Sequence, residues 1–149
     1  MRLYVNIQSS VVILERNSNG TYEESYSLPM IPSIYNLDFS DDENMLVVIC
    51  VDASVKVYKK SGVDFILNQV IPHSGFIWPI NLSKDKKKMA VYQSFVNIIR
   101  VYENNGTQFI SHQNITVTFS VEEISLSVDM MEAHGVSSMI LIYYLNGVG

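Results

Sequence analysis

The sequence is poor in the residues that mark several large classes of protein. It has one cysteine, Cys50, which cannot form a disulfide within the chain, and its apolar neighbours in LVVICV favour a buried small residue over a reactive thiol. Charged residues make up only 17% of the chain against 48% hydrophobic residues, which excludes a disordered chain and predicts a folded core. The longest apolar run, MILIYYL, is far shorter than the roughly 20 residues of a transmembrane helix, so no membrane span is expected.

Export signals and basic regions are also scarce. The opening stretch MRLYVNIQSS is interrupted by polar residues and lacks the apolar segment of a secretory signal, which favours a cytoplasmic location. Fifteen acidic residues against ten basic ones give a net charge of −5. This balance argues against nucleic acid as a specific ligand.

The short motifs that mark many catalytic and cofactor sites are missing. The chain has no CxxC pair, HExxH, GxSxG, Walker-type glycine loop or dinucleotide-binding fingerprint. The three histidines, His73, His112 and His134, lie in different segments without metal-ligand spacing. Asp41 and Asp42 begin a turn, but the alternating oxygen ligands of a calcium loop do not follow. We therefore expect no metal, no cofactor and no catalytic residue.

An internal repeat of 43 to 44 residues runs through the chain. The stretch IYNLDFSDDENML matches IWPINLSKDKKKM and then VEEISLSVDMMEAHGVSSM. Residues at equivalent places in the repeat include Ile34, Ile77 and Val121, then Ser40, Ser83 and Ser127, and then Leu14, Tyr58 and Tyr102. A period in the low forties is typical of proteins built from stacked copies of one supersecondary unit.

Each repeat contains four short segments rich in Val, Ile, Tyr and Phe and bounded by Gly, Asn, Asp and Ser. This pattern predicts antiparallel strands joined by hairpins, and four strands in such a period predict an all-β propeller blade. The first complete repeat should hold strands at Ile34–Ser40, Leu46–Val51, Val55–Lys59 and Phe65–Val70. The next should hold strands at Ile77–Ser83, Met89–Ser94, Ile98–Tyr102 and Gln108–Gln113.

At this point the chain resembles the WD40-like repeat proteins, with a YVTN-type propeller as a related alternative. VIPHSGFIWPINLSKD resembles the passage from the outermost strand through a His-containing loop into the innermost strand, and VDASVKVYKK resembles the Asp turn and the strand after it. The resemblance implies that His73, Ser83 and Asp52 have structural, hydrogen-bonding roles. It also implies that Tyr58 and its equivalent Tyr102 take the place of a structural Trp.

The repeat divides the 149 residues into an incomplete propeller. We expect a partial blade over 1–28, complete blades over 34–70 and 77–113, and a partial blade over 121–149 whose strands are Val121–Ser127 and Met139–Leu145. These are thirteen strands, or about three and a quarter blades. A closed ring needs about four to eight blades, so more of the chain, further copies of it, or a partner protein would complete the ring.

Two surfaces are candidates for partner binding. The face with the turn between first and second strands has an acidic turn, SDDEN, beside a basic one that contains Lys84, Lys86, Lys87 and Lys88. The lysines either orient a partner or are solvated turn residues. Loops of the opposite face carry a set of apolar residues, Met30, Ile31, Phe76, Phe95 and Phe119. These either dock a partner or pack against the neighbouring blade.

The function expected from these observations is that of a non-catalytic protein–protein interaction scaffold, a WD40-like module within a larger assembly. The WD40-like resemblance implies the scaffold, and the missing motifs imply that the protein is not an enzyme. The alternative is a sensor or enzyme propeller whose catalytic part lies outside these residues. A cluster of polar side chains along the central channel would favour that alternative.

Overall fold

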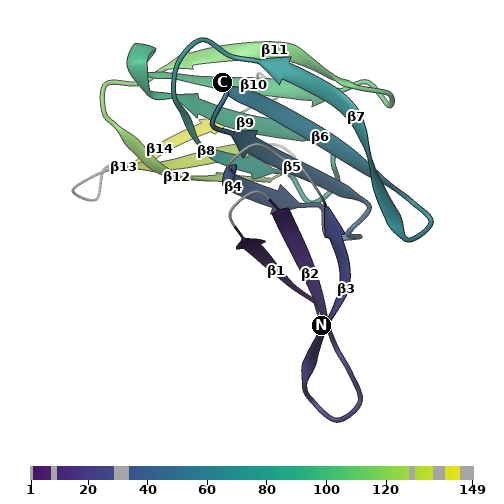
Figure 1. Cartoon of the computed structure of the whole chain (residues 1–149). Helices are drawn as coiled ribbons and strands as arrows, with labels where there is room; N and C mark the ends of the chain where they lie inside the picture. Colours follow the sequence, from purple (N-terminus) through teal and green to yellow (C-terminus); the bar gives the residue numbers. More distant parts are fainter. Residues whose placement is uncertain (1, 8–9, 29–33, 128–129, 136–139, 145–149) are drawn as a thin grey trace.

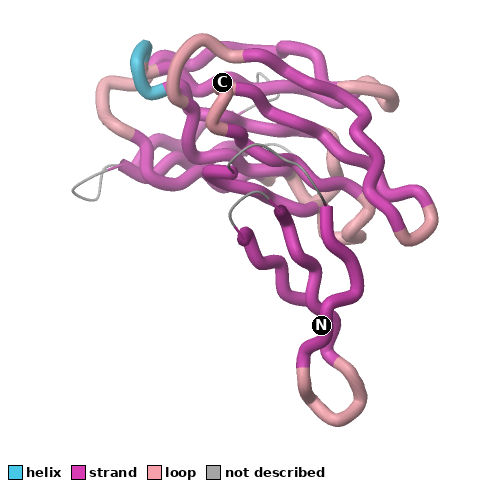
Figure 2. The backbone as a smooth tube through the Cα atoms, viewed as in Figure 1, coloured by secondary structure: helices cyan, strands magenta, loops and turns pink. Residues whose placement is uncertain are grey.

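The computed structural model describes residues 2–7, 10–28, 34–127, 130–135 and 140–144. This part of the chain contains fourteen β-strands and one short turn of 3-10 helix (Figure 1). The strands form four separate antiparallel sheets, in which each strand pairs with the next one along the chain. The described residues therefore form an all-β structure of hairpin-linked sheets, as the repeat predicts (Figure 2).

The bounds of the strands follow the repeat closely. The first sheet contains β1 (Arg2–Ile7), β2 (Ser10–Arg16) and β3 (Tyr22–Leu28). The second contains β4 (Ile34–Phe39), β5 (Met45–Cys50), β6 (Ser54–Ser61) and β7 (Asp64–Pro72). The third contains β8 (Ile77–Leu82), β9 (Lys88–Gln93), β10 (Ile98–Asn104) and β11 (Phe109–Thr116), with the 3-10 turn η1 (Ser94–Val96) between β9 and β10. The fourth contains β12 (Val121–Leu126), β13 (Met130–Gly135) and β14 (Ile140–Tyr144).

The four sheets are propeller blades that stack face to face. The first strands of the second, third and fourth sheets, β4, β8 and β12, lie next to one another and form the inner side of the arc. The last strands of the two four-stranded sheets, β7 and β11, lie at the outer side. This arrangement confirms the prediction of an incomplete propeller built from four-stranded antiparallel blades.

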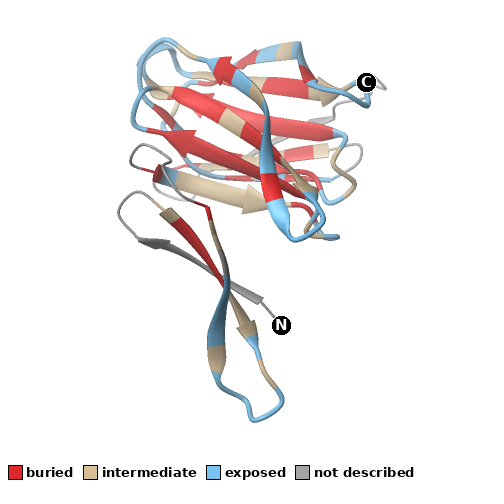
Figure 3. Cartoon of the chain, turned by 45° about the vertical axis from the view of Figure 1, so that its right-hand side comes forward, coloured by how far each residue is buried: buried red, intermediate tan, exposed pale blue. Residues whose placement is uncertain are grey.

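Apolar side chains from facing sheets fill the spaces between the blades. Between the second and third blades, Val47 and Ile49 of β5 pack with Ile80 of β8 and Met89 of β9. A second apolar layer, which includes Tyr92, lies between the third and fourth blades. A third layer lies between the first and second blades. The middle strands are accordingly the most buried parts of the molecule (Figure 3).

The fourth sheet differs from its prediction. The segment Met139–Leu145, expected to be the second strand, contains β14, which is the third strand of the sheet. The second strand is β13, which pairs with both β12 and β14. Its sequence, MMEAHG, has no β-branched or aromatic residue, so strand propensity does not reveal it. The described residues thus contain fourteen strands in place of thirteen.

The turn between the first and second strands has the same construction in the two complete blades. The hydroxyl of Ser40 donates to Asp42 and accepts from the Met45 N–H, and Ser83 does the same with Asp85 and Lys88. The residue after each aspartate has a positive φ, 54° at Glu43 and 62° at Lys86. Because the two turns have the same backbone conformation, the side chains in which they differ are not needed to form the turn.

Candidate functional site

A line of polar contacts crosses the inner strands of three blades. One carboxylate oxygen of Asp38 on β4 accepts hydrogen bonds from the Leu82 N–H, at 2.7 Å, and from the Asn81 amide, at 3.2 Å, both on β8. The side-chain oxygen of Asn81 in turn accepts the Leu126 N–H of β12 at 2.9 Å. The side chain from one blade thus bonds a backbone N–H on the first strand of the next blade. That first strand is an edge strand of its sheet, and the bond lies on the edge that pairs with no other strand.

The carboxyl group of Asp38 lies in an unfavourable position for a charge. Burial raises its pKa, and the hydrogen bonds from the N–H groups of Leu82 and Phe39 offset only part of that effect. The other carboxylate oxygen accepts the Phe39 N–H at 2.8 Å. One oxygen thus joins β4 to β8 and the other bonds the next residue of β4, so the carboxylate of Asp38 links the second and third blades.

The fourth sheet carries four polar side chains on one face. Cross-strand pairing places Glu123 of β12 opposite His134 of β13, and Ser125 opposite Glu132. Directly paired residues project on the same side of a sheet, with Cβ atoms about 5 Å apart. The His134 Nε2 atom lies 3.2 Å from Glu132 Oε1, and both side chains are about one-third exposed. We refer to Glu123, Ser125, Glu132 and His134 as the polar patch.

On β13 the polar patch has polar residues where the preceding blades have apolar ones, whereas the place of Ser125 on the inner strand is already polar in those blades, at Asp38 and Asn81. In the second blade, Val47 and Ile49 hold the places of Glu132 and His134, and they are fully buried against the third blade. In the third blade, Ala90 holds the place of Glu132 and is buried in the layer shared with the fourth blade. Strand β13 therefore places a carboxyl group and an imidazole, which are side chains of the general acid–base type, where β5 has valine and isoleucine side chains.

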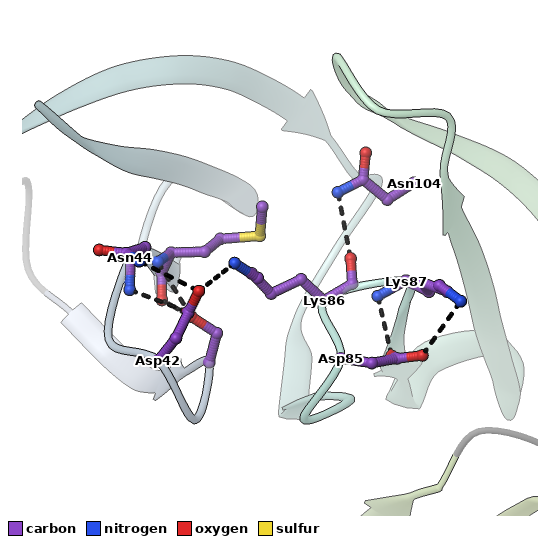
Figure 4. Close-up of polar contacts among 8 residues, drawn as sticks. Asp42, Asn44, Asp85, Lys86, Lys87 and Asn104 are labelled. Carbon is purple, nitrogen blue, oxygen red and sulfur yellow. Dashed lines mark hydrogen bonds and ion pairs between the residues drawn. The ribbon is translucent and has the colours of Figure 1, made fainter.

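A pocket of about 490 Å³ opens between the second and third blades, at the turns of one face (Figure 4). It is lined by amide groups of Asn44 and Asn104, by the carboxylate of Asp85, and by a set of lysines, Lys59, Lys60, Lys86 and Lys87. We call this site the lysine pocket.

The polar groups of the lysine pocket hold the two turns side by side. Lys86 forms an ion pair with Asp42 across the gap between the blades, and Lys86 and the Ser40 hydroxyl hold the pKa of that carboxyl well below its usual range. The Asn104 amide donates to the Lys86 carbonyl at 3.1 Å. Figure 4 shows Lys86 directed toward Asp42 and Lys87 directed back toward Asp85. The acidic and basic turns expected from the sequence thus meet in one place.

Two of the residues given structural roles by the resemblance come together. The hydroxyl of Tyr102 lies 3.2 Å from His73 Nε2, and the two rings are in edge-to-face contact. Burial, with a smaller contribution from the charge of Arg100, lowers the pKa of His73 to about 4. The imidazole is therefore neutral at pH 7.

The other three residues with assigned structural roles lie in separate contacts. Ser83 bonds within its own turn, as described above. Asp52 accepts bonds from the N–H and hydroxyl of Ser54, which closes the turn between β5 and β6. Tyr58 is buried in the layer toward the first blade, where burial raises the pKa of its hydroxyl to about 12. Of the five residues with assigned structural roles, only His73 and Tyr102 contact each other, so the five do not form one hydrogen-bond network.

The candidate partner residues have mixed positions. Lys84 and Lys87 are exposed and Lys86 is partly exposed, but Lys88 is only 6% exposed and does not belong to that surface. On the opposite face Phe95 is 80% exposed and Phe76 is 40% exposed. Phe119 packs inward against the layer between the third and fourth blades. Met30 and Ile31 lie outside the described residues.

Sequence reasoning missed the polar line and the polar patch. Both can be found by aligning the repeats in register, because Asp38, Asn81 and Ser125 then fall at one position of the inner strand. The same alignment makes His134 equivalent to Ile49. It can be made only if β13 is recognised as a strand, and the composition of β13 is not typical of a strand. Within the described segments, the polar patch included, no three His, Cys, Asp or Glu side chains converge as metal ligands. In those segments no helix is long and apolar enough to cross a membrane.

Sequence comparisons find no relatives. No protein-family model matches the chain, and no curated protein matches it. Assignment to a sequence family therefore has no support from these comparisons, and the WD40-like assignment is not confirmed.

Solved structures, in contrast, match the fold well. A candidate 6-phosphogluconolactonase from Bacteroides uniformis matches with a TM-score of 0.75 and 12% identity over 92% of this chain and 44% of its own. The periplasmic gluconolactonase PpgL of Pseudomonas aeruginosa matches with a TM-score of 0.72 and 14% identity over 91% of this chain and 44% of its own. The Cps50 (Swd1) β-propeller domain of Myceliophteria thermophila matches with a TM-score of 0.75 and 10% identity over 98% of this chain and 53% of its own.

These matches show a β-propeller fold, and the chain spans about half of the length of the structures it matches. They also correct one prediction. The protein was expected not to be an enzyme because catalytic motifs are missing, but proteins of the same fold are named as gluconolactonases. Missing motifs therefore do not exclude catalysis in this fold. The cytoplasmic location stays a prediction, since one of the matching proteins is named as periplasmic. The chain is an arc of a β-propeller.

Proposed function

We propose that the chain is part of a β-propeller hydrolase that opens a sugar lactone. The observation that carries this proposal is the pair Glu132 and His134 of the polar patch, which stand where the second blade has Val47 and Ile49, in a fold shared with proteins named as gluconolactonases. The sequence left open an enzyme propeller whose catalytic part lies outside these residues; the proposal keeps the enzyme and places catalytic groups within them.

The polar patch has the groups that lactone hydrolysis requires. His134 Nε2 lies 3.2 Å from Glu132 Oε1. In the mechanism we propose, His134 is the tautomer with its proton on Nε2, this N–H donates to Glu132, and Nδ1 takes a proton from water. The hydroxide so formed attacks the lactone carbonyl carbon, and the ring C–O bond then breaks. The proton on His134 passes to the departing ring oxygen, and the product is an open-chain hydroxy acid. Glu132 holds the imidazole in this orientation throughout.

The test is a titration of acid release by the purified protein with gluconolactone and with 6-phosphogluconolactone. Lactones hydrolyse spontaneously, so the rate without protein is subtracted. The proposal predicts acid release that saturates with lactone concentration and scales with protein concentration. A rate equal to the spontaneous one for both lactones would contradict it.

A second function has support from a different surface. Phe95, Tyr35, Phe76 and Trp78 leave large aromatic areas exposed, with Phe95 at 80%. Large exposed aromatic side chains are typical of the centres of protein–protein interfaces. We propose that this aromatic surface contacts another protein in an assembly. Phe95→Ser should remove a partner from the complex purified from the source organism, whereas retention of every partner would contradict this proposal.

A further inference from the structure

The lysine pocket has a size suited to a small ligand. Its volume of about 490 Å³ lies within the range of about 300–1,000 Å³ that is usual for small-molecule sites. It lies between the second and third blades, whereas the polar patch lies on the far face of the fourth. The two sites are therefore separate, and ligand binding at one does not require the other.

The charge of the lysine pocket is concentrated and is opposite in sign to that of the whole chain. Four lysines and a single carboxylate line it, in a chain of net charge −5. Of these lysines, Lys86 is paired with Asp42 and the Lys59 ammonium donates to the Thr107 carbonyl at 2.9 Å. Lys87 is 71% exposed and lies 3.9 Å from Asp85, and Lys60 has no ion pair among the described residues. Lys60 and Lys87 are thus the two ammonium groups most available to an anion.

The preceding pair of blades provides an internal comparison. By the 44-residue spacing Glu15 and Arg16 stand where the pocket has Lys59 and Lys60, and by the 43-residue spacing Glu43 and Asn44 stand where it has Lys86 and Lys87. The backbone of the turn is the same in both places. Four positive charges at one junction correspond to one positive and two negative charges at the other. The fold therefore does not require the lysines.

Hydrogen-bond donors surround the lysines in a way that fits oxygen-rich anions. The side-chain amide of Asn44 donates to Asp42 at 3.0 Å, and that of Asn104 donates to the Lys86 carbonyl. These bonds fix the two amides at the pocket wall, and Lys60 and Lys87 lie on opposite blades beside them. A phosphate group has several acceptor oxygens and at least one full negative charge at neutral pH, so it can contact both blades at once.

We propose that the lysine pocket binds the phosphate group of a small phosphorylated metabolite, and that Lys60 and Lys87 are its main contacts. The ligand bridges the second and third blades. Its binding therefore also stabilises the junction between them, by the amount that mass action gives.

The experiment measures binding of glucose 6-phosphate, inorganic phosphate and glucose to the purified protein by isothermal titration calorimetry at low and high salt. We expect glucose 6-phosphate to bind more tightly than phosphate, glucose not to bind, and affinity to fall as salt screens the lysines. Phosphate binding as tightly as the sugar phosphate would overturn the metabolite part of the proposal and leave a free-phosphate site.

The decisive variant is Lys60→Asn with Lys87→Asn. The third blade has Asn104 at the place of Lys60, and the second has Asn44 at the place of Lys87, so both replacements suit the fold. The matched control is Lys84→Asp, which changes the net charge by the same amount, lies in the same turn outside the pocket, and copies Asp41 of the second blade.

The double variant should weaken glucose 6-phosphate binding at least tenfold, and Lys84→Asp should weaken it less than twofold. Equal weakening by both would show a diffuse effect of net charge and overturn the site. If no binding is detected at about 10 mM ligand, the affinity is weaker than a formed site should give, and the proposal is overturned too. Tighter binding of an aspartate-rich peptide than of any phosphate compound would assign the pocket to a protein partner instead. Melting temperatures of the variants establish that each is folded.

Discussion

Replacement of Asp38 by alanine tests how the inner strands hold successive blades together. The Asp38 carboxylate is the acceptor for the Leu82 N–H, and Leu82 is only 4% exposed. Without Asp38 this buried donor loses its partner, which costs about 1–3 kcal/mol. Removal of a carboxylate whose pKa is raised by burial gives back part of that cost. We therefore expect Asp38→Ala to lower the free energy of unfolding by about 1–2 kcal/mol.

The assay is denaturation by urea, followed by fluorescence of the single tryptophan, Trp78, which lies on β8, the strand that also contains Leu82. The matched control is Asp41→Ala, a carboxylate in the adjoining exposed turn, and it should change stability by less than about 0.5 kcal/mol. Equal effects of the two replacements would refute the reasoning, because they would show that the contact between β4 and β8 adds no stability.

The pH dependence of stability, compared between the unmodified protein and Asp38→Asn, gives an independent check. The folded-state pKa of Asp38 is raised above its unfolded value of 3.8, so folding favours its protonated form. Its contribution to stability is therefore greatest below about pH 4 and is lost as the pH rises through the raised pKa. Asp38→Asn should remove this part of the pH dependence, and an unchanged profile would contradict the burial of the carboxyl.

Three further outcomes follow from contacts within and between blades. The Gln69 amide exchanges two hydrogen bonds of 2.8 Å with the backbone of Phe109 in the next blade, so Gln69→Ala should cost about 1–2 kcal/mol in urea denaturation, and no loss would contradict that contact. Met89 is fully buried between the second and third blades, and Met89→Ala should cost about 2–5 kcal/mol; a loss under 1 kcal/mol would mean that the layer is loosely packed. The pKa of His73 is lowered from 6.5 to about 4 by burial, so the protein should lose stability as the pH falls from about 6.5 toward 4, and His73→Gln should flatten that dependence in melts recorded between pH 4 and pH 7.

The sequence was sufficient to predict the fold because the repeat sets the boundaries of the blades. Equivalent residues such as Ile34, Ile77 and Val121 begin the inner strands of successive sheets, as their spacing predicts. Strand propensity alone failed at β13, where packing against the neighbouring strands, and not intrinsic preference, makes MMEAHG a strand.

The candidate sites were predictable only in part. The acidic and basic turns of the second and third blades are visible as charge runs, and the structure adds that they share one pocket. Asp38 and Asn81 each bond a backbone N–H of the next blade. The alignment of the repeats shows that the two residues are equivalent, but it does not show which backbone group each side chain contacts. The polar patch required correct assignment of β13, since an error in that strand also displaces His134 from the sheet face.

The measurement that tests the central claim most directly is the lactone hydrolysis rate of His134→Gln relative to His112→Gln. The two histidines make similar contacts with a carboxylate, His134 Nε2 with Glu132 at 3.2 Å and His112 Nδ1 with Glu103 at 3.5 Å, and both are just over one-third exposed. Only His134 belongs to the polar patch. Loss of a general base should lower kcat by about 100-fold or more in His134→Gln and leave His112→Gln within twofold of the unmodified protein. Equal rates for the two variants would contradict the hydrolase account of the polar patch.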